Sequence, residues 1–369
     1  MTTASIPVNA DEKYREYIDR IEKLKTASIS KTIPKELYKK NVFRALLGFF
    51  SSYAVYIGSI VGIAFAPHWS VVILLLITAG LGGWGLHCIA HDCGHGSFSN
   101  SKTLNSIVGH LSLIPLLYPF HSWRHVHNMH HGSTNHLEMD TDWRPVSREV
   151  YDRMPFTDRM VYLFTRSVGF WAGTLHYWWV SAFRTDFYPQ ARARADVRRS
   201  IGFIFAVSLI LFPTLWYFTG ITGVLLYFIL PLIATHAWFS ITTLMHHTAT
   251  DVPFLEKENW SLNGSRILLT TDYLYPKWLL FLTHNISVHA AHHAAPTVPF
   301  YNLPKAQTAL KEAFPGMIRE KPFKFKTLWE IVTSCHFYDP KTGYYVSTRE
   351  SSNDGHHDIM SANKGHSDA

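Results

Sequence analysis

Three clusters of histidines along the chain have the spacing of metal ligands. The first is an HxxxH pair, and the second and third repeat one HxxHH pattern. Residues three and four positions apart share one face of a helix, so the imidazole rings of each cluster can converge on one point. The clusters predict a metal centre assembled from His91, His95, His127, His130, His131, His289, His292 and His293.

Eight imidazoles are more than one metal ion can bind, but they suit two ions that keep open coordination positions. Neutral imidazole binds iron, zinc, copper and nickel, so the ligand type alone does not name the metal. Carboxylate-bridged diiron sites in helical bundles use Glu-x-x-His motifs, and the sequence contains none. This combination favours a histidine-rich diiron site that activates oxygen.

A further candidate ligand lies at the end of the last apolar segment, where His246 and His247 are adjacent. His247 shares a helical face with His236, which lies about 16 Å deeper along the helix. We expect His247 to be a ninth ligand and His236 to be a buried, hydrogen-bonded residue too deep for the same metal. His246 points away from this face, which favours a role other than metal ligand.

Other polar residues near the boxes are expected to support the ligands, because a metal-bound imidazole needs a partner for its second ring nitrogen. Candidate partners are the carboxylates Asp92, Glu138, Asp140 and Asp142. For Glu138, simple solvation at the surface is an equal alternative. Five nearby histidines are expected to be supporting or structural residues: His110, His121, His125, His176 and His284.

Two long stretches without charged residues must position these boxes. Residues 45–90 divide at Pro67, and residues 201–247 divide near Gly220. Each half is long enough to cross a bilayer as a helix. The sequence therefore predicts two helical hairpins, with spans at about 45–66, 69–90, 201–219 and 223–246.

Every Lys and Arg lies on the side of these hairpins that holds both termini and the boxes. The positive-inside rule predicts that this side is cytoplasmic, as in a bacterial inner or thylakoid-type membrane. Two shorter apolar segments are not expected to cross the membrane: 106–120 is expected to be re-entrant or interfacial, and 170–183 to be an interfacial helix. The first is interrupted by Pro115 and Pro119, and the second is rich in Trp and Tyr.

The composition fits a membrane protein, with 47% hydrophobic and 17% charged residues. The net charge of +7 lies outside the apolar stretches, and without a nucleic-acid-binding motif it indicates topology rather than nucleic-acid binding. Three cysteines without a CxxC pair argue against a disulfide framework, and the N-terminus lacks an apolar signal core. We expect a cytoplasmic amphipathic segment at 1–42, the main domain at 43–349 and a disordered tail at 350–369.

Longer motifs surround the boxes: HDCGHGSF (91–98), PLLYPFHSWR (115–124), NISVHAAHH (285–293), PFYNL (299–303) and CHFYDPKTGY (335–344). With these motifs the sequence resembles the membrane fatty-acid desaturases, most closely the bacterial and cyanobacterial acyl-lipid Δ12 branch, from about Ile33 to about Tyr344. The resemblance implies an all-α integral membrane fold with four transmembrane helices and a cytoplasmic cap that holds two irons. It implies that the eight box histidines and His247 bind these irons. No His-Pro-Gly-Gly haem signature occurs, so electrons are expected from a separate ferredoxin or small cytochrome.

The resulting hypothesis is O2-dependent insertion of a cis double bond into a fatty-acyl chain, at the Δ12 or omega-6 position of a membrane lipid. An unactivated C–H bond offers no handle for acid–base chemistry, so the metal must supply the oxidising power. A hydroxylase, acetylenase or ketolase of the same superfamily, or a desaturase of carrier-protein-bound chains, remains an alternative. A histidine-rich metal transporter is disfavoured, because transport sites lie near the bilayer midplane whereas these boxes fall outside the predicted spans.

Overall fold

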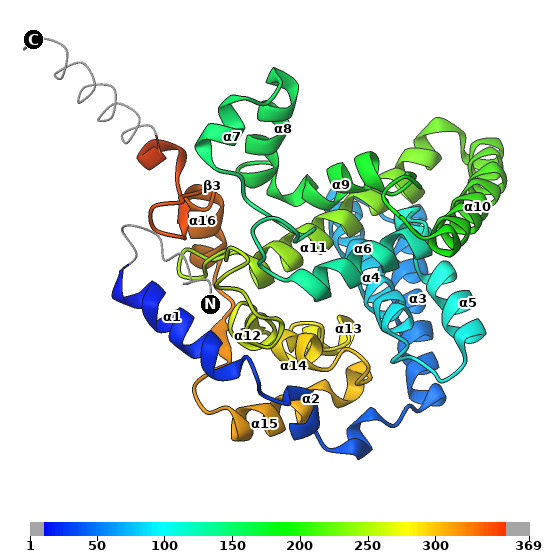
Figure 1. Ribbon diagram of the computed structural model, residues 1–369. Helices are drawn as coiled ribbons and strands as arrows, with labels where there is room; N and C mark the ends of the chain where they lie inside the picture. Colours follow the sequence, from blue (N-terminus) through cyan, green and yellow to red (C-terminus); the bar gives the residue numbers. More distant parts are fainter. Residues whose placement is uncertain (1–10, 352–369) are drawn as a thin grey trace, which may run out of the picture.

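The computed structural model describes residues 11–351, and these residues are mainly helical (Figure 1). Three helical stretches are long and apolar enough to cross a membrane, namely α3 (Val42–Ala64), α4 (Trp69–His95) and the continuous stretch Ala191–His247. Helices α3 and α4 are joined by a short turn at Pro67 and His68 and pack against each other as a hairpin.

The third stretch contains both of the later predicted spans. It consists of α10 (Ala191–Val224), a π-helical turn (Leu225–Ile229) and α11 (Leu230–His247). Gly220 interrupts the helix with φ 62° and ψ −169°, a conformation that glycine adopts far more readily than other residues. Beyond this break the chain packs back on itself, and the Phe212 and Phe228 ring centroids lie 5.2 Å apart. The break lies where the sequence predicts the second hairpin turn.

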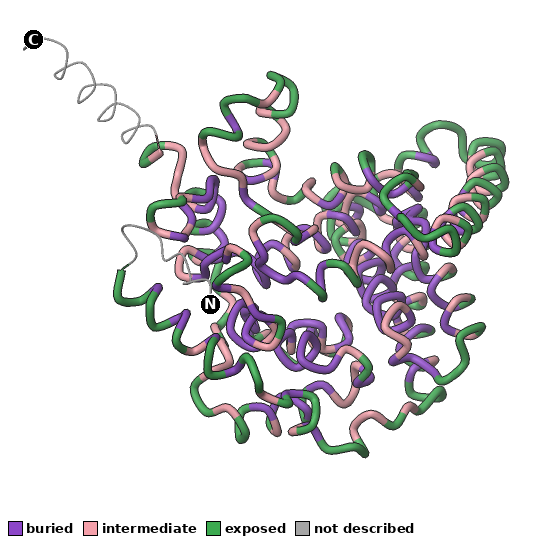
Figure 2. Tube along the Cα trace, in the orientation of Figure 1, coloured by how far each residue is buried: buried purple, intermediate pink, exposed green. Residues whose placement is uncertain are grey.

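The outer faces of these helices are apolar and exposed. Figure 2 shows α10 exposed along most of its length, and its uncovered side chains include Leu209, Trp216 and Phe218. The exposed face of α3 carries Phe43, Leu47, Phe50, Ile57 and Val61. Continuous apolar surface of this kind is unfavourable in water but matches the lipid of a bilayer.

Helix α4 lies between α3 and α11, and glycines allow the close packing. A Cβ atom on Gly80 would lie 2.7 Å from the backbone carbonyl carbon of Ala234 in α11. On another face of α4, a Cβ atom on Gly82 would lie 2.7 Å from the backbone nitrogen of Tyr56 in α3. Side chains at these positions would separate the helices. Close contact therefore places the histidine-bearing ends of α4 and α11 near each other.

The chain between α4 and α10 forms short helices. They are α5 (Lys102–Ser112), η2 (Ile114–Leu116), α6 (Phe120–Ser133), α7 (Arg148–Asp152), α8 (Phe156–Arg166), η3 (Phe170–Ala172) and α9 (Gly173–Ser181). The segment 106–120 is divided among α5, η2 and the first residue of α6. Neither this segment nor 170–183 forms a helix long enough to cross a membrane. Ile107 in α5 and Trp179 in α9 are exposed, in keeping with the predicted contact with the interface.

The remaining elements pack over one end of the long helices. They are α1 (Glu12–Leu24), α2 (Ile29–Thr32), η1 (Lys35–Tyr38), α12 (Leu262–Leu268), α13 (Lys277–Leu282), α14 (His289–Ala294), η5 (Phe300–Asn302), α15 (Leu303–Ala313) and α16 (Phe325–Ser334). The apolar face of α1 is covered by protein, because Tyr14, Ile18 and Ile21 belong to one buried cluster with Leu268 and Leu310. This cluster joins the N-terminal helix to the elements that carry the third histidine box.

Two small sheets accompany the helices. Strand β1 (Thr271–Leu274) pairs in parallel with β2 (Arg319–Pro322), and β3 (Phe337–Tyr338) pairs antiparallel with β4 (Tyr345–Val346). The all-helical prediction therefore missed these four short strands, which carry no strong alternation of polar and apolar residues. The disordered tail predicted at 350–369 lies outside the described residues from 352 onward.

Candidate metal centre

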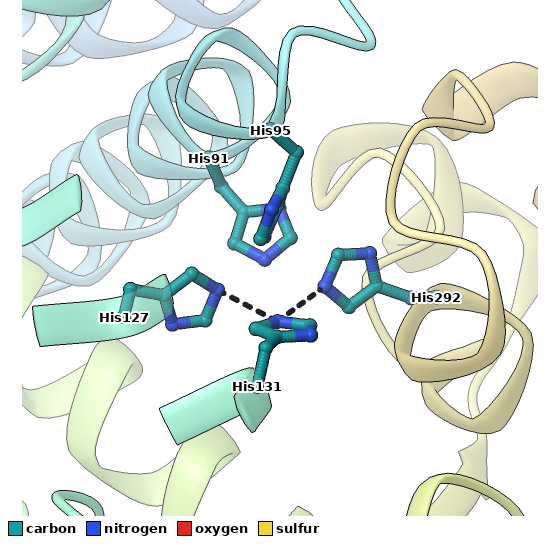
Figure 3. A group of neighbouring side chains, drawn as sticks. All are labelled: His91, His95, His127, His131 and His292. Atoms are coloured by element: carbon teal, nitrogen blue, oxygen red, sulfur yellow. Dashed lines mark hydrogen bonds between the residues drawn. The ribbon is translucent and has the colours of Figure 1, made fainter. Parts of the chain in front are cut away.

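The structure gathers five of the predicted ligands into one group (Figure 3). Their candidate ligand nitrogens all lie within 4.8 Å of one another. The Nε2 atom of His131 is central, at 3.0 Å from Nε2 of both His127 and His292. We call this the first histidine group: His91 and His95 from α4, His127 and His131 from α6, and His292 from α14.

The other four predicted ligands form an adjoining group. The ligand nitrogens of His130, His247 and His293 lie within 4.8 Å of one another. The Nε2 atom of His289 lies 2.8 Å from that of His247 and 3.0 Å from that of His293. We call these four residues the second histidine group. All four are buried, and the two groups touch where the rings of His131 and His293 stack at 4.1 Å.

Helix geometry explains why each HxxHH box contributes to both groups. Residues four apart differ by about 40° around a helix, whereas residues three apart differ by about 60° in the opposite sense. In α6, the pair His127 and His131 therefore enters the first group while His130 turns to the second. In α14 the assignment is reversed, since His289 and His293 enter the second group and His292 crosses to the first. The two boxes interlock and fix the groups side by side.

The donor set fits metal ions. Imidazole nitrogens face one another at 2.8–3.2 Å. Several of the buried ring nitrogens have no hydrogen-bond partner within the described chain. They include both nitrogens of His91, Nε2 of His95 and Nδ1 of His247. Burying such atoms without partners costs free energy. Metal ions bound between the rings would accept lone pairs from many of these nitrogens.

The protonation states also favour metal binding. Burial, followed by the neighbouring histidines, holds the pKa of His131 and of His293 well below the ordinary value of 6.5. Neutral imidazole is the form that binds a metal ion. His130 differs, because burial lowers its pKa but the charge and hydrogen bond of Asp140 outweigh burial and raise it.

Asp140 orients His130. Its Oδ1 lies 2.7 Å from Nδ1 of His130, and its Oδ2 accepts a 2.6 Å hydrogen bond from the backbone N–H of Asn135. A carboxylate on Nδ1 places the proton there and leaves the lone pair of Nε2 facing the second histidine group. The hydroxyl of Thr134 similarly lies 3.2 Å from Nδ1 of His293.

Asp272 is a supporting residue that no sequence motif indicates. It is buried in β1, and its Oδ1 accepts hydrogen bonds from the backbone N–H groups of His289 and Ala290 at 3.0 and 2.8 Å. Its Oδ2 accepts one from the side-chain amide of Gln307. These bonds satisfy the free N–H groups at the start of α14 and so fix the third box. Nothing local identifies Asp272, because it is 17 residues from His289.

The remaining predicted carboxylates have different environments. Asp92 is buried and accepts a 3.0 Å hydrogen bond from the backbone N–H of Phe300. Asp142 donates its backbone N–H to Asp140 at 3.0 Å. Glu138 is exposed, which agrees with the alternative of simple solvation.

The other histidines near the boxes lie outside both groups. His236 is buried and lies 3.2 Å from the hydroxyl of Thr174. His246 packs against the ring of His289 at 4.1 Å, and neither of its nitrogens has a partner in the described chain. Nε2 of His284 lies 2.7 Å from the hydroxyl of Ser52. His176 is exposed. His110, His121 and His125 line a cavity that reaches the first group at His95.

Comparison with known proteins agrees with this geometry. The sequence model of the family described as fatty acid desaturase matches residues 67–320, which include every histidine of both groups. An sn-1 oleoyl-lipid 12-desaturase from Synechocystis sp. is 35% identical over 93% of this chain and 97% of its own length. The corresponding enzyme from Picosynechococcus sp. is 33% identical over 89% of this chain and 94% of its own length. A chloroplastic omega-6 fatty acid desaturase from Spinacia oleracea is 34% identical over 86% of this chain and 70% of its own length.

These matches cover most of the chain, and they confirm the family resemblance that the histidine motifs indicated. Together with the apolar helices and the two histidine groups, they show that this chain belongs to the fatty acid desaturase family and is a membrane-associated oxidoreductase that desaturates fatty-acyl chains.

Proposed function

We propose that this enzyme introduces a cis double bond at the Δ12, or omega-6, position of an oleoyl chain that is esterified to a membrane lipid. The observation that carries the proposal is the pair of interlocked histidine groups at the ends of apolar helices. The names of the cyanobacterial relatives specify an oleoyl lipid and position 12, and the name of the spinach relative specifies omega-6.

The proposal includes two iron ions, one for each histidine group. The first would be held by His91, His95, His127, His131 and His292, and the second by His130, His247, His289 and His293. Bound iron supplies the O2 and one-electron chemistry that amino-acid side chains lack. In the overall reaction, O2, two electrons, two protons and two hydrogens from adjacent methylenes give the double bond and two waters.

The protein contributes orientation and exclusion of water. Asp140 and Thr134 set the ring orientations of His130 and His293. Asp272 holds the start of α14. Trp123 stacks on His127 at 4.7 Å and covers the first group with an apolar surface. Such a site fixes the ligands and limits access of bulk water to reactive species.

In the membrane, we propose two hairpins, α3 with α4 and α10 with α11, so that four helices span the bilayer. The catalytic domain is residues 43–349, and the segment 1–42 joins it on the cytoplasmic side together with the cap and both termini. The concentration of Lys and Arg on this side supports the orientation. Electrons would come from a separate carrier, either a ferredoxin or a small cytochrome.

Expression in a host that contains oleate but no polyenoic acids tests the function. With a competent electron donor, the wild-type protein should produce a diene with its new bond at position 12. His292→Ala should abolish the product, whereas His176→Ala, at an exposed histidine outside both groups, should retain it. Absence of new unsaturation with the wild type, or a product heavier by one oxygen atom, would contradict the proposal. Analysis of separated lipid classes would distinguish lipid-bound from carrier-bound substrate.

A further inference from the structure

A cavity of about 1170 Å³ lies beside the first histidine group. It is bounded by the end of α4, by α5, by the first turns of α6 and by the start of α10. One of its lining residues is His95, a member of the first group. The cavity therefore adjoins the proposed iron site at His95.

The cavity is positively charged. Its only acidic lining residue is Asp196, which pairs with Arg199 and lies 4.0 Å from Arg124. Lys102 and Arg192 also line the cavity, and no ion pair between described residues involves either of them. The cationic side chains thus outnumber the single carboxylate. Burial and the nearby Arg124 lower the pKa of His121 to about 3, so this histidine adds no charge.

The cavity lies at the level expected for lipid headgroups. Residues 191–200 of α10 contain four arginines and one aspartate, and the charge-free stretch begins at Ile201. Helix α5 begins at Lys102 on the cavity and exposes the apolar side chains of Ile107 and Leu111. Charged residues that flank a span lie in the interface, where each Lys or Arg attracts anionic lipids.

We propose that this cavity binds the anionic phosphate or sulfonate headgroup of an acyl lipid and thereby selects anionic lipids as substrates. The inference rests on the proposed desaturation of lipid-bound chains. Arg124, Arg192 and Arg199 can make bidentate hydrogen bonds to such a group. The cations line a concave site next to His95, which suits a small headgroup better than the surface of an electron-carrier protein.

The test compares the double variant Lys102→Gln/Arg192→Gln with wild type, using iron-loaded enzyme in vesicles. Vesicles of neutral galactolipid contain oleoyl chains either in phosphatidylglycerol or in the galactolipid itself. We expect the KM for oleoyl phosphatidylglycerol to rise about 25-fold, or about fivefold for each cation removed, with the KM for oleoyl galactolipid unchanged. The control Lys257→Gln/Lys305→Gln removes two exposed charges that do not line the cavity and should leave both KM values unchanged. Arg192→Lys, which keeps the charge, should retain most of the preference for the anionic lipid.

Equal KM changes for the two lipids, or no change, would overturn the inference while leaving the desaturase function intact. A change confined to the KM for the reduced electron carrier would also overturn it and assign the cations to carrier docking.

A second measurement does not need turnover. The phosphatidylglycerol that stays bound after purification in neutral detergent is quantified with and without inorganic phosphate in the wash. Retention by wild type despite phosphate, and loss in the variant, supports a lipid headgroup. Complete displacement by phosphate would mean that free phosphate is the ligand. If wild type retains the lipid but desaturates no chain, the proposed function fails and the headgroup site stands.

Discussion

Among the nine histidines, His130 and His293 contact polar side chains outside the boxes, which orient their rings. The side chain of Asp140 is fully buried. Its oxygens face Nδ1 of His130 and accept hydrogen bonds from the backbone N–H groups of Asn135 and Asp142. Glu138, two residues earlier, is exposed. Of these two neighbouring carboxylates, Asp140 therefore supports the site and Glu138 is solvated.

Asp140→Asn should weaken iron binding about 10- to 100-fold, because an amide is a poorer partner for Nδ1–H of His130 and no longer fixes the ring. Iron per protein, measured during chelator titration, provides the readout, and the loss should be larger at the site that contains His130. Glu138→Gln is the matched control and should bind iron like wild type. Equal iron affinity in Asp140→Asn and wild type would show that the carboxylate does not support the site.

At the scale of elements, close helix packing sets the position of the histidines at the end of α4. A Cβ atom on Gly80 would meet the backbone of α11 at 2.7 Å, whereas one on Gly58, on the exposed face of α3, would meet nothing within 4 Å. Displacement of α4 from α11 would move His91 and His95 relative to His247. The close contact at Gly80 therefore affects the relative positions of the two histidine groups.

Gly80→Ala should lower the stability by about 1–3 kcal/mol through overpacking and should also reduce desaturase activity. Gly58→Ala makes the same chemical change without the contact, and it should leave stability unchanged or slightly higher because alanine favours a helix. Thermal unfolding in detergent and product formation per bound iron are the two measurements. Equal effects of the two substitutions would exclude the close contact as the cause.

An ion-pair cluster joins three distant segments of the cap. Asp251, after α11, bonds Arg319 at 2.8 Å and Lys321 at 3.1 Å, and Arg319 also bonds the hydroxyl of Tyr17 in α1 at 2.7 Å. Burial raises the pKa of Asp251, but the charges and hydrogen bonds of Arg319 and Lys321 outweigh burial and lower it below 3.8. The folded state therefore holds the carboxylate in its charged form more strongly than the unfolded state does.

Asp251→Asn should cost about 1 kcal/mol of stability at pH 7. A lowered pKa in the folded state stabilises the protein above the unfolded pKa, and this contribution is lost as the pH falls through the folded value. The difference between variant and wild type should accordingly be constant from pH 7 to about 5 and shrink below the unfolded pKa of 3.8. Melting temperatures of variant and wild type across this pH range measure the stability difference. A stability difference that does not depend on pH would rule out the ionic contribution.

For the whole molecule, the two proposed hairpins would place the histidine groups and the cap on one side of the membrane. The three native cysteines are buried, so single cysteines introduced at exposed positions can report topology with little background labelling. His68 and Thr222 lie at the two hairpin turns, and Lys257 lies in the cap.

In sealed right-side-out membrane vesicles, a membrane-impermeant maleimide should label His68→Cys and Thr222→Cys but not Lys257→Cys. Inverted vesicles should give the opposite pattern, because the positive-inside rule keeps the cap cytoplasmic. Labelling of all three positions from the same side would contradict the proposed hairpins. Labelling of the cap from outside would reverse the orientation.

The features that depend on local spacing could be predicted from the sequence alone. Histidines three and four apart must lie near one another on a helix, and charge-free stretches of more than 18 residues favour membrane spans. These patterns were sufficient to nominate all nine histidines that the structure brings together, and the motifs around them identified the family. The break at Gly220 was also evident, because a glycine-containing polar turn divides an otherwise continuous apolar stretch.

The distribution of the histidines between the two groups depends on how distant helices pack and could not be predicted from the sequence. The exchange of His130 and His292 across the boxes depends on the angle at which α6 meets α14, which no local pattern specifies. Asp272 contacts the start of α14 from a strand that pairs with β2, and Lys102 and Arg192 line one cavity although they lie on different helices. These relationships join residues that are distant in sequence, so they arise from helix packing and not from the local preferences of the chain.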